Sequence, residues 1–172
     1  ADIPTRTINH KEFESREAFD SAVTEALKEA EVDLVCNAGF MRLHSEGFVR
    51  EWWNRHLNIH PSLLPAFPGL DTHARVLDAG VKISGCTVHF VRPKMDAGPV
   101  VAQAAVPVLP GDTEDSLAGR VLAAEHHLYA HALRLVAAGE VRVEGETVVD
   151  LTRVKDEAPQ TPLFSPPLPE GL

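Results

Sequence analysis

Two polar side chains lie two positions apart in a short, otherwise apolar run that ends at Pro61: Asn58 and His60. On a β-strand, residues two apart point to the same face, so the sequence predicts a carboxamide and an imidazole side by side. Such a pair can donate hydrogen bonds to the negative charge that develops on oxygen when a nucleophile attacks a carbonyl. Without further context, a hydrogen-bonded structural pair is the commoner interpretation.

Two further motifs supply that context. Residues 85–91 read Gly-Cys-Thr-Val-His-Phe-Val, and Asp-Ala-Gly-Pro follows at 96–99. Together with the Asn-Ile-His-Pro-Ser-Leu-Leu-Pro run at 58–65, they resemble the formyltetrahydrofolate-dependent formyltransferase superfamily. The residues around Pro61 and in the 87–90 strand are similar to the glycinamide ribonucleotide formyltransferases within it. The resemblance extends from about Ile3 to Val143.

The resemblance implies a catalytic set of Asn58, His60 and Asp96. The implied reaction moves a formyl group from the co-substrate 10-formyltetrahydrofolate to the amine of glycinamide ribonucleotide in de novo purine biosynthesis. Asn58 and a protonated His60 would stabilise the oxyanion, and the Asp96 carboxylate would favour the imidazolium and orient a water that relays the proton. By residue type alone, Asp96 is a turn residue.

The resemblance also implies two binding surfaces. The loop after Gly39 resembles the wall that receives the pterin ring, the loop before Asp96 resembles the opposing wall, and Arg16 matches a position near the glutamate tail. Glu125 matches a contact to the nucleotide substrate, and no metal is implied. The folate-binding set is Arg16, Met41, Arg42, Leu43, His44, Asn58, Arg92, Pro93, Lys94 and Met95. By residue type alone, Arg16 and Glu125 are solvated surface charges.

The sequence departs from the family in the folate pocket. Asn37, His44 and His56 stand where the family usually has apolar residues lining or flanking the pocket. Buried polar groups need partners. These three residues therefore indicate either a retuned pocket or relaxed selection.

A second departure concerns the start of the domain. The family begins with a strand, a glycine-rich loop and a helix that hold the substrate phosphate, and the sequence shows no such segment before Ala1. We therefore expect an N-terminally truncated domain that binds folate better than glycinamide ribonucleotide and has little activity alone, since remote phosphate contacts help to orient the amine.

The elements that position these residues alternate between strand and helix. Apolar runs predict strands at 32–36, 57–60, 85–91 and 100–108, and helical periodicity predicts helices from Ser15 and over 45–55, 72–79 and 113–138. This order predicts an α/β fold with a mostly parallel twisted sheet and flanking helices, of the Rossmann-like formyltransferase type. Residues 1–150 are expected to form the catalytic domain, and residues 151–172 a Pro-rich tail.

Composition narrows the function classes. A net charge of -9 argues against nucleic acid as a partner, and no apolar run is long enough for a membrane, so a cytoplasmic protein with small-molecule substrates is expected. Cys36 and Cys86 are expected to be small buried thiols. The His127 and His131 pair has no apparent third metal ligand.

Other functions remain open at this stage. A formyltetrahydrofolate hydrolase shares the Asn, His, Asp set, and a non-catalytic folate-binding fragment fits the missing phosphate loop. A methionyl-tRNA formyltransferase is disfavoured, since the chain is acidic and lacks an RNA-binding barrel. The sequence leaves homo-oligomerisation undecided.

Overall fold

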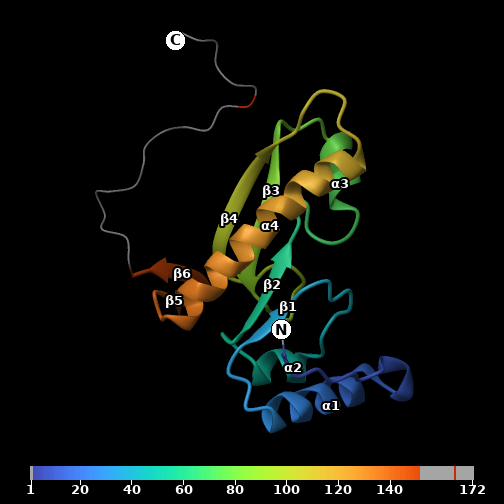
Figure 1. The fold of residues 1–172 in the computed structure, drawn as a ribbon, viewed down its shortest axis with the longest axis vertical. Coiled ribbons are helices and arrows are strands. Elements are labelled where there is room, and N and C mark those ends of the chain that lie inside the picture. Colours follow the sequence, from blue (N-terminus) through green and yellow to red (C-terminus); the bar gives the residue numbers. More distant parts are fainter. Residues whose placement is uncertain (1, 152–164, 166–172) are drawn as a thin grey trace.

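The computed structural model describes residues 2–151 and Ser165. Its elements in chain order are a 3₁₀ helix η1 (His10–Glu12), α1 (Arg16–Glu29), β1 (Val35–Asn37), α2 (Glu46–Glu51), β2 (His56–His60), α3 (Thr72–Asp78), β3 (Ile83–Phe90), β4 (Val100–Pro107), α4 (Glu114–Ala137), β5 (Val141–Glu144) and β6 (Thr147–Asp150), as Figure 1 shows. Apart from Leu151 and Ser165, the Pro-rich tail predicted over 151–172 lies outside the described residues.

The main sheet has the strand order β1-β2-β3-β4. The α/β fold class is confirmed, but the sheet is mixed and not mostly parallel: β1 runs parallel to β2, whereas the β2/β3 and β3/β4 pairs are antiparallel. For β3 and β4 the reason is the connection between them, residues 91–99. It is shorter than the dozen or so residues that a parallel crossover requires.

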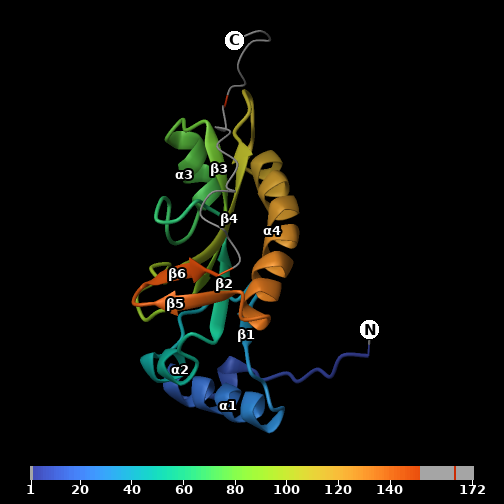
Figure 2. The same ribbon diagram turned by 90° about the vertical axis from the view of Figure 1, so that its left-hand side faces the viewer.

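The helix α4 covers one face of this sheet: it runs along β3 and β4, as Figure 2 shows, and α3 packs against it. The helix α4 begins at a capping box in which Thr113 Oγ1 accepts from Ser116 N and Ser116 Oγ accepts from Thr113 N. Its buried stripe packs into the core; the stripe consists of Leu117, Val121, Leu128, Ala132 and Leu135. This stripe has the helical spacing from which the helix over 113–138 was predicted.

The helix α1 begins where the sequence placed its N-cap. Ser15 Oγ accepts a hydrogen bond of 3.1 Å from Ala18 N, and the helix packs against α2. No strand forms over residues 2–9. Cys36 is exposed, which corrects the expectation of a buried thiol there, whereas Cys86 is buried as expected and both are free thiols.

Candidate active site

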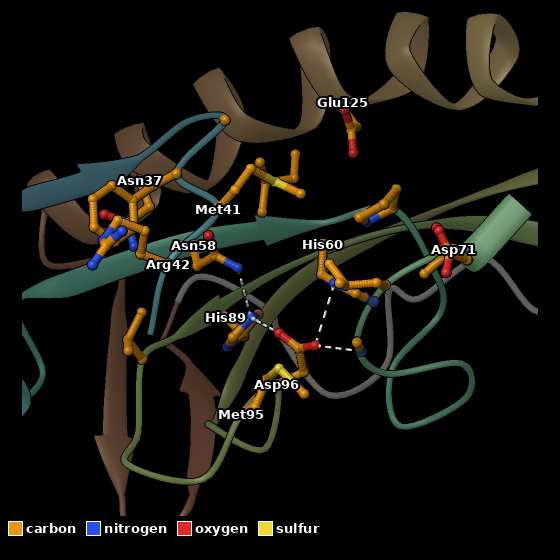
Figure 3. A pocket seen from close by; sticks show the side chains of 18 of the residues that line it. Asn37, Met41, Arg42, Asn58, His60, Asp71, His89, Met95, Asp96 and Glu125 are labelled. Atoms are coloured by element: carbon orange, nitrogen blue, oxygen red, sulfur yellow. Dashed lines mark hydrogen bonds and ion pairs between the residues drawn. The ribbon is translucent and has the colours of Figure 1, made fainter. Parts of the chain in front are cut away.

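Four polar side chains from three segments meet beside β2. Asn58 and His60 lie on that strand, His89 lies on β3 in register with Asn58, and Asp96 comes from the connection that follows β3. Asp96 Oδ2 lies 3.5 Å from His60 Nδ1, and Asp96 Oδ1 lies 3.8 Å from His89 Nε2. Figure 3 shows these side chains pointing toward one another. The sequence predicted Asn58, His60 and Asp96 in one place, and the geometry brings them together.

The position of Asp96 depends on backbone contacts. Its Oδ2 accepts a hydrogen bond of 2.8 Å from Gly69 N, and its own backbone lies in the left-handed region at φ 51°. Two residues later Gly98 passes so close to β3 that a Cβ there would lie 1.7 Å from the Phe90 carbonyl oxygen. The connection is thus fixed against the end of β3, which sets where the carboxylate lies.

Both ring nitrogens of His60 face hydrogen-bond acceptors. Nδ1 faces the Asp96 carboxylate, and Nε2 lies 3.0 Å from the Phe67 carbonyl oxygen. A neutral imidazole has only one N–H and would satisfy one of these acceptors, whereas an imidazolium satisfies both. The surroundings of this buried ring therefore accommodate a positive charge.

The sequence assigned no role in the site to His89, and its contact with Asn58 was missed. Its Nδ1 donates to the Phe90 carbonyl oxygen at 3.0 Å, which leaves Nε2 of a neutral ring as an acceptor for Asn58 Nδ2 at 3.3 Å. Burial is the main cause that lowers the pKa of His89, against the opposing effects of the Phe90 bond and Asp96, so the ring is neutral at pH 7. The contact follows from the register of β2 against β3, which the spacing of residues within one strand does not reveal.

These side chains line a cavity of about 860 Å³. One wall is the loop over residues 39–44, and another is formed by residues of the 91–99 connection. Glu125 projects from α4 toward the same space from the opposite side (Figure 3). Glu125 is half-buried, not the free surface charge that its residue type alone indicated, and this burial raises the pKa of its carboxyl.

Most of the predicted folate-binding residues border this cavity. Met41, Arg42, Leu43, His44, Arg92, Pro93 and Met95 do so, together with Asn58. The guanidinium of Arg92, however, is engaged elsewhere: it pairs with Glu146 at 2.9 Å and stacks over the Trp53 ring at 3.9 Å.

Two of the predicted folate-binding residues lie apart from the cavity. Lys94 is not among its lining residues in the described part of the chain. Arg16 is likewise absent from the lining; it is exposed at the start of α1, where it pairs with Glu17.

Over residues 2–151, no group of three His, Cys, Asp or Glu side chains is arranged to hold a metal ion. Within the same residues, no helix combines the length and the apolar character that crossing a bilayer requires.

The fold and this site define a class of protein. Residues 1–133 match the family model described as formyl transferase, and the chain belongs to that family. It is 56% identical over 143 residues to the trifunctional purine biosynthetic protein adenosine-3 of Bos taurus, an alignment that covers 83% of this chain and 14% of that protein.

Smaller relatives are matched over more of their length. The chain is 43% identical to the phosphoribosylglycinamide formyltransferase of Escherichia coli K12, covering 83% of this chain and 68% of that protein. Among solved structures, glycinamide ribonucleotide transformylase 1 from Symbiobacterium toebii aligns with a TM-score of 0.82 at 51% identity, covering 84% of this chain and 68% of that one.

Proposed function

We propose that the chain transfers a formyl group from 10-formyltetrahydrofolate to the amine of glycinamide ribonucleotide, a step of purine biosynthesis. The observation that carries the proposal is the grouping of Asn58, His60 and Asp96 at the wall of a single large cavity. The names of the relatives support the choice of substrates, since the E. coli relative is a phosphoribosylglycinamide formyltransferase.

In the proposed reaction, the substrate amine attacks the formyl carbon and a C–N bond forms while the formyl oxygen gains negative charge. The free N–H of the Asn58 amide donates a hydrogen bond to this oxygen, and the positive charge of the His60 imidazolium, whose own N–H groups face Asp96 and the Phe67 carbonyl, stabilises it electrostatically. The nitrogen of the folate then leaves as the C=O bond re-forms. The Asp96 carboxylate, 3.5 Å from His60 Nδ1, stabilises the positive charge of the imidazolium and assists proton transfer from the attacking to the departing nitrogen.

Glu125 and the two loops supply the binding part of the proposal. The 39–44 loop and the cavity-lining residues of the 91–99 connection enclose the folate, and the Glu125 carboxylate, on the opposite side of the cavity, receives a hydrogen bond from the nucleotide substrate. Binding groups on opposite sides of the reacting atoms hold amine and formyl carbon in line. A cytoplasmic location and the lack of a nucleic-acid partner stay predictions from the sequence.

A transfer assay tests the proposal. The purified chain is incubated with both substrates, and formylated product and free formate are measured in parallel. We expect formylated product at a low rate, in line with the little activity expected from the sequence, and a further loss of about 10²- to 10³-fold in kcat for Asn58→Leu, the size typical of losing one oxyanion donor. Arg50→Gln, an exposed change on α2, is the control and should retain activity.

Each alternative has its own outcome in this assay. Formate release that ignores the amine substrate would identify a hydrolase. Folate binding without either product would identify a non-catalytic folate-binding protein. Either result would overturn the proposed transfer.

A further inference from the structure

A network of three polar side chains, Asp20, His44 and Asn37, extends from α1 to the wall of the cavity. Asp20, 2% exposed on α1, accepts from Ser45 N through Oδ2 at 2.5 Å, and its Oδ1 lies 3.3 Å from His44 Nδ1. His44 Nε2 in turn lies 3.4 Å from Asn37 Nδ2. Asp20 does not border the cavity, whereas His44 and Asn37 do. This network thus links a buried carboxylate to the site.

This network fixes the orientation of the Asn37 amide. A carboxylate only accepts, so His44 must present Nδ1–H to Asp20. Burial is the main cause that lowers the pKa of His44, which keeps the ring neutral, and Nε2 is then an acceptor. Because Nε2 accepts, Asn37 must turn its NH₂ end toward His44. One N–H and the carbonyl oxygen of the amide are left over.

The aromatic surroundings hold His44 in place. Its ring stacks between Phe40, at 4.3 Å between centroids, and Phe48, at 4.1 Å, with both pairs nearly parallel. His56 packs its ring edge-on against His44 at 4.9 Å. The His44 side chain is only 6% exposed. Rotation of the imidazole would break these stacks, so the tautomer and the ring orientation are both set by the fold.

Asn37 lies next to the proposed reaction centre. It ends β1 and is in register with Asn58 on the neighbouring parallel strand, so the two side chains lie on the same face of strands whose backbones are about 4.8 Å apart. Figure 3 shows both at one end of the pocket. In the described part of the chain, no hydrogen bond uses Asn37 Oδ1. A donor and an acceptor, side by side and in fixed order, thus remain available beside the cavity.

We propose that Asn37 is a specificity-determining residue that recognises the polar edge of the folate ring, and that His44 and Asp20 are positioning residues that set which end of its amide faces that edge. The inference rests on the proposed function. The folate ring is joined by one methylene to the nitrogen that carries the formyl group, so a formyl carbon at Asn58 brings the ring within reach of β1.

The chemistry of Asn37 selects this part of the ligand. An aminopyrimidinone ring edge presents adjacent donors and acceptors, which match a carboxamide of fixed orientation. The benzoyl group has no such edge. The glutamate tail is anionic and calls for cations, not for an amide set by a neighbouring carboxylate.

Ring preference measured with folate analogues tests the proposal. Dissociation constants are determined for three unreactive analogues: one with a 2-amino-4-oxo ring, one with a 2,4-diamino ring and one with the 2-amino group replaced by methyl. We expect wild type to bind the first analogue most tightly. In Asn37→Leu, the ratio of affinities between the first analogue and at least one of the others should fall by about three- to tenfold, the usual net contribution of one hydrogen bond. Met41→Leu, an apolar change in the same wall, should alter affinity for all three equally.

A pair of His44 variants separates positioning from packing. His44→Phe keeps a flat ring between Phe40 and Phe48 but removes both nitrogens, so it should lose ring preference as Asn37→Leu does. His44→Gln offers an amide oxygen that can accept from Asn37 Nδ2 and should recover it. If packing were the whole role of His44, Phe would retain the preference.

The outcomes distinguish this inference from the function on which it rests. If wild type binds a folate and both Asn37→Leu and His44→Phe keep the wild-type preferences within about twofold, the inference is wrong and the proposed function stands. If wild type binds none of the three analogues, the proposed function fails, and the inference fails with it.

Discussion

An amide side chain stabilises an oxyanion only when its N–H end faces the oxygen, and the two ends of an Asn side chain are nearly identical in shape. In this chain two amides beside one cavity are each oriented by a neutral histidine. His89 accepts from Asn58, and His44 accepts from Asn37. Each imidazole is itself fixed by an acceptor on its other nitrogen, Phe90 O or Asp20. Amide orientation is therefore set two contacts away from the ligand.

At the residue scale, this control of amide orientation predicts that His89→Leu lowers kcat by about ten- to a hundredfold with little change in KM. Asn58 would lose its fixed orientation, which weakens its hydrogen bond to the transition state more than substrate binding. His89→Gln should recover part of the rate, since its amide oxygen can accept from Asn58 Nδ2. Steady-state kinetics with both substrates measures this. Equal rates for the Leu and Gln variants would show that His89 does not act through Asn58.

Part of this site was predictable from single residues and part was not. The i, i+2 spacing placed Asn58 and His60 on one face of β2, because side-chain alternation is local. Asp96 required the family motif, since its loop by itself indicates only a turn. The His89 contact depends on the register of β2 against β3, and register is decided by the whole sheet. Arg92 was expected at the folate, but Glu146, on a hairpin distant in sequence, holds its guanidinium.

At the scale of elements, the helices were easier to predict than the strand pairing. The capping residues Ser15 and Thr113 and the stripe of α4 are local signals, and they mark the observed ends within a residue or two. The hairpin of β5 and β6 was missed, although Gly145 at φ 62° marks its two-residue turn. The prediction of a mostly parallel sheet was wrong for the β3/β4 pair. The alternation of strands and helices favours parallel pairs, but the connection over 91–99 is too short for a parallel crossover.

The connection that carries Asp96 makes a second prediction. Gly98→Ala should destabilise the protein by at least about 2 kcal/mol, because its Cβ would overlap the Phe90 backbone and neither segment can yield without breaking the β3 end. Gly119→Ala is the matched control: it lies inside α4 with open space around its Cα and should be neutral or stabilising by up to about 1 kcal/mol. Urea unfolding of both variants measures the difference. Similar stabilities would show that the connection adapts.

At the scale of the whole molecule, the fold encloses several histidines as neutral rings. The pKa values of His44, His56 and His89 are lowered mainly by burial. His56 is the extreme case: burial, with smaller effects from the charges of His44 and His89, lowers its pKa to about 3. It is 1% exposed, and in the described part of the chain neither ring nitrogen has a hydrogen-bond partner. An aliphatic side chain there would leave no polar atom unpaired.

The buried histidines make the folded state less stable as the pH falls. A histidine whose pKa is lower in the folded state binds its proton more readily when unfolded, so acid favours unfolding. The effect is absent well above pH 6.5, where His56 is neutral in both states. It grows by about 1.4 kcal/mol per pH unit as pH falls from 6.5 toward 3. Falling net negative charge acts in the opposite direction over the same range, so wild-type stability alone does not isolate the histidine.

The difference between wild type and His56→Leu does isolate it, because the two carry the same charge when His56 is neutral. We expect His56→Leu to be more stable by about 1 to 3 kcal/mol at pH 7.5, since it removes two unpaired polar atoms from the core. We expect this advantage to grow by about 2 kcal/mol by pH 5, as protonation of His56 in unfolded wild type sets in. Urea unfolding at a series of pH values measures both quantities. His127→Leu, at an exposed histidine on α4, serves as the control and should show no such growth. Parallel stability curves for wild type and His56→Leu between pH 7.5 and pH 5 would mean that His56 titrates alike in the folded and unfolded chain, against the burial on which the prediction stands.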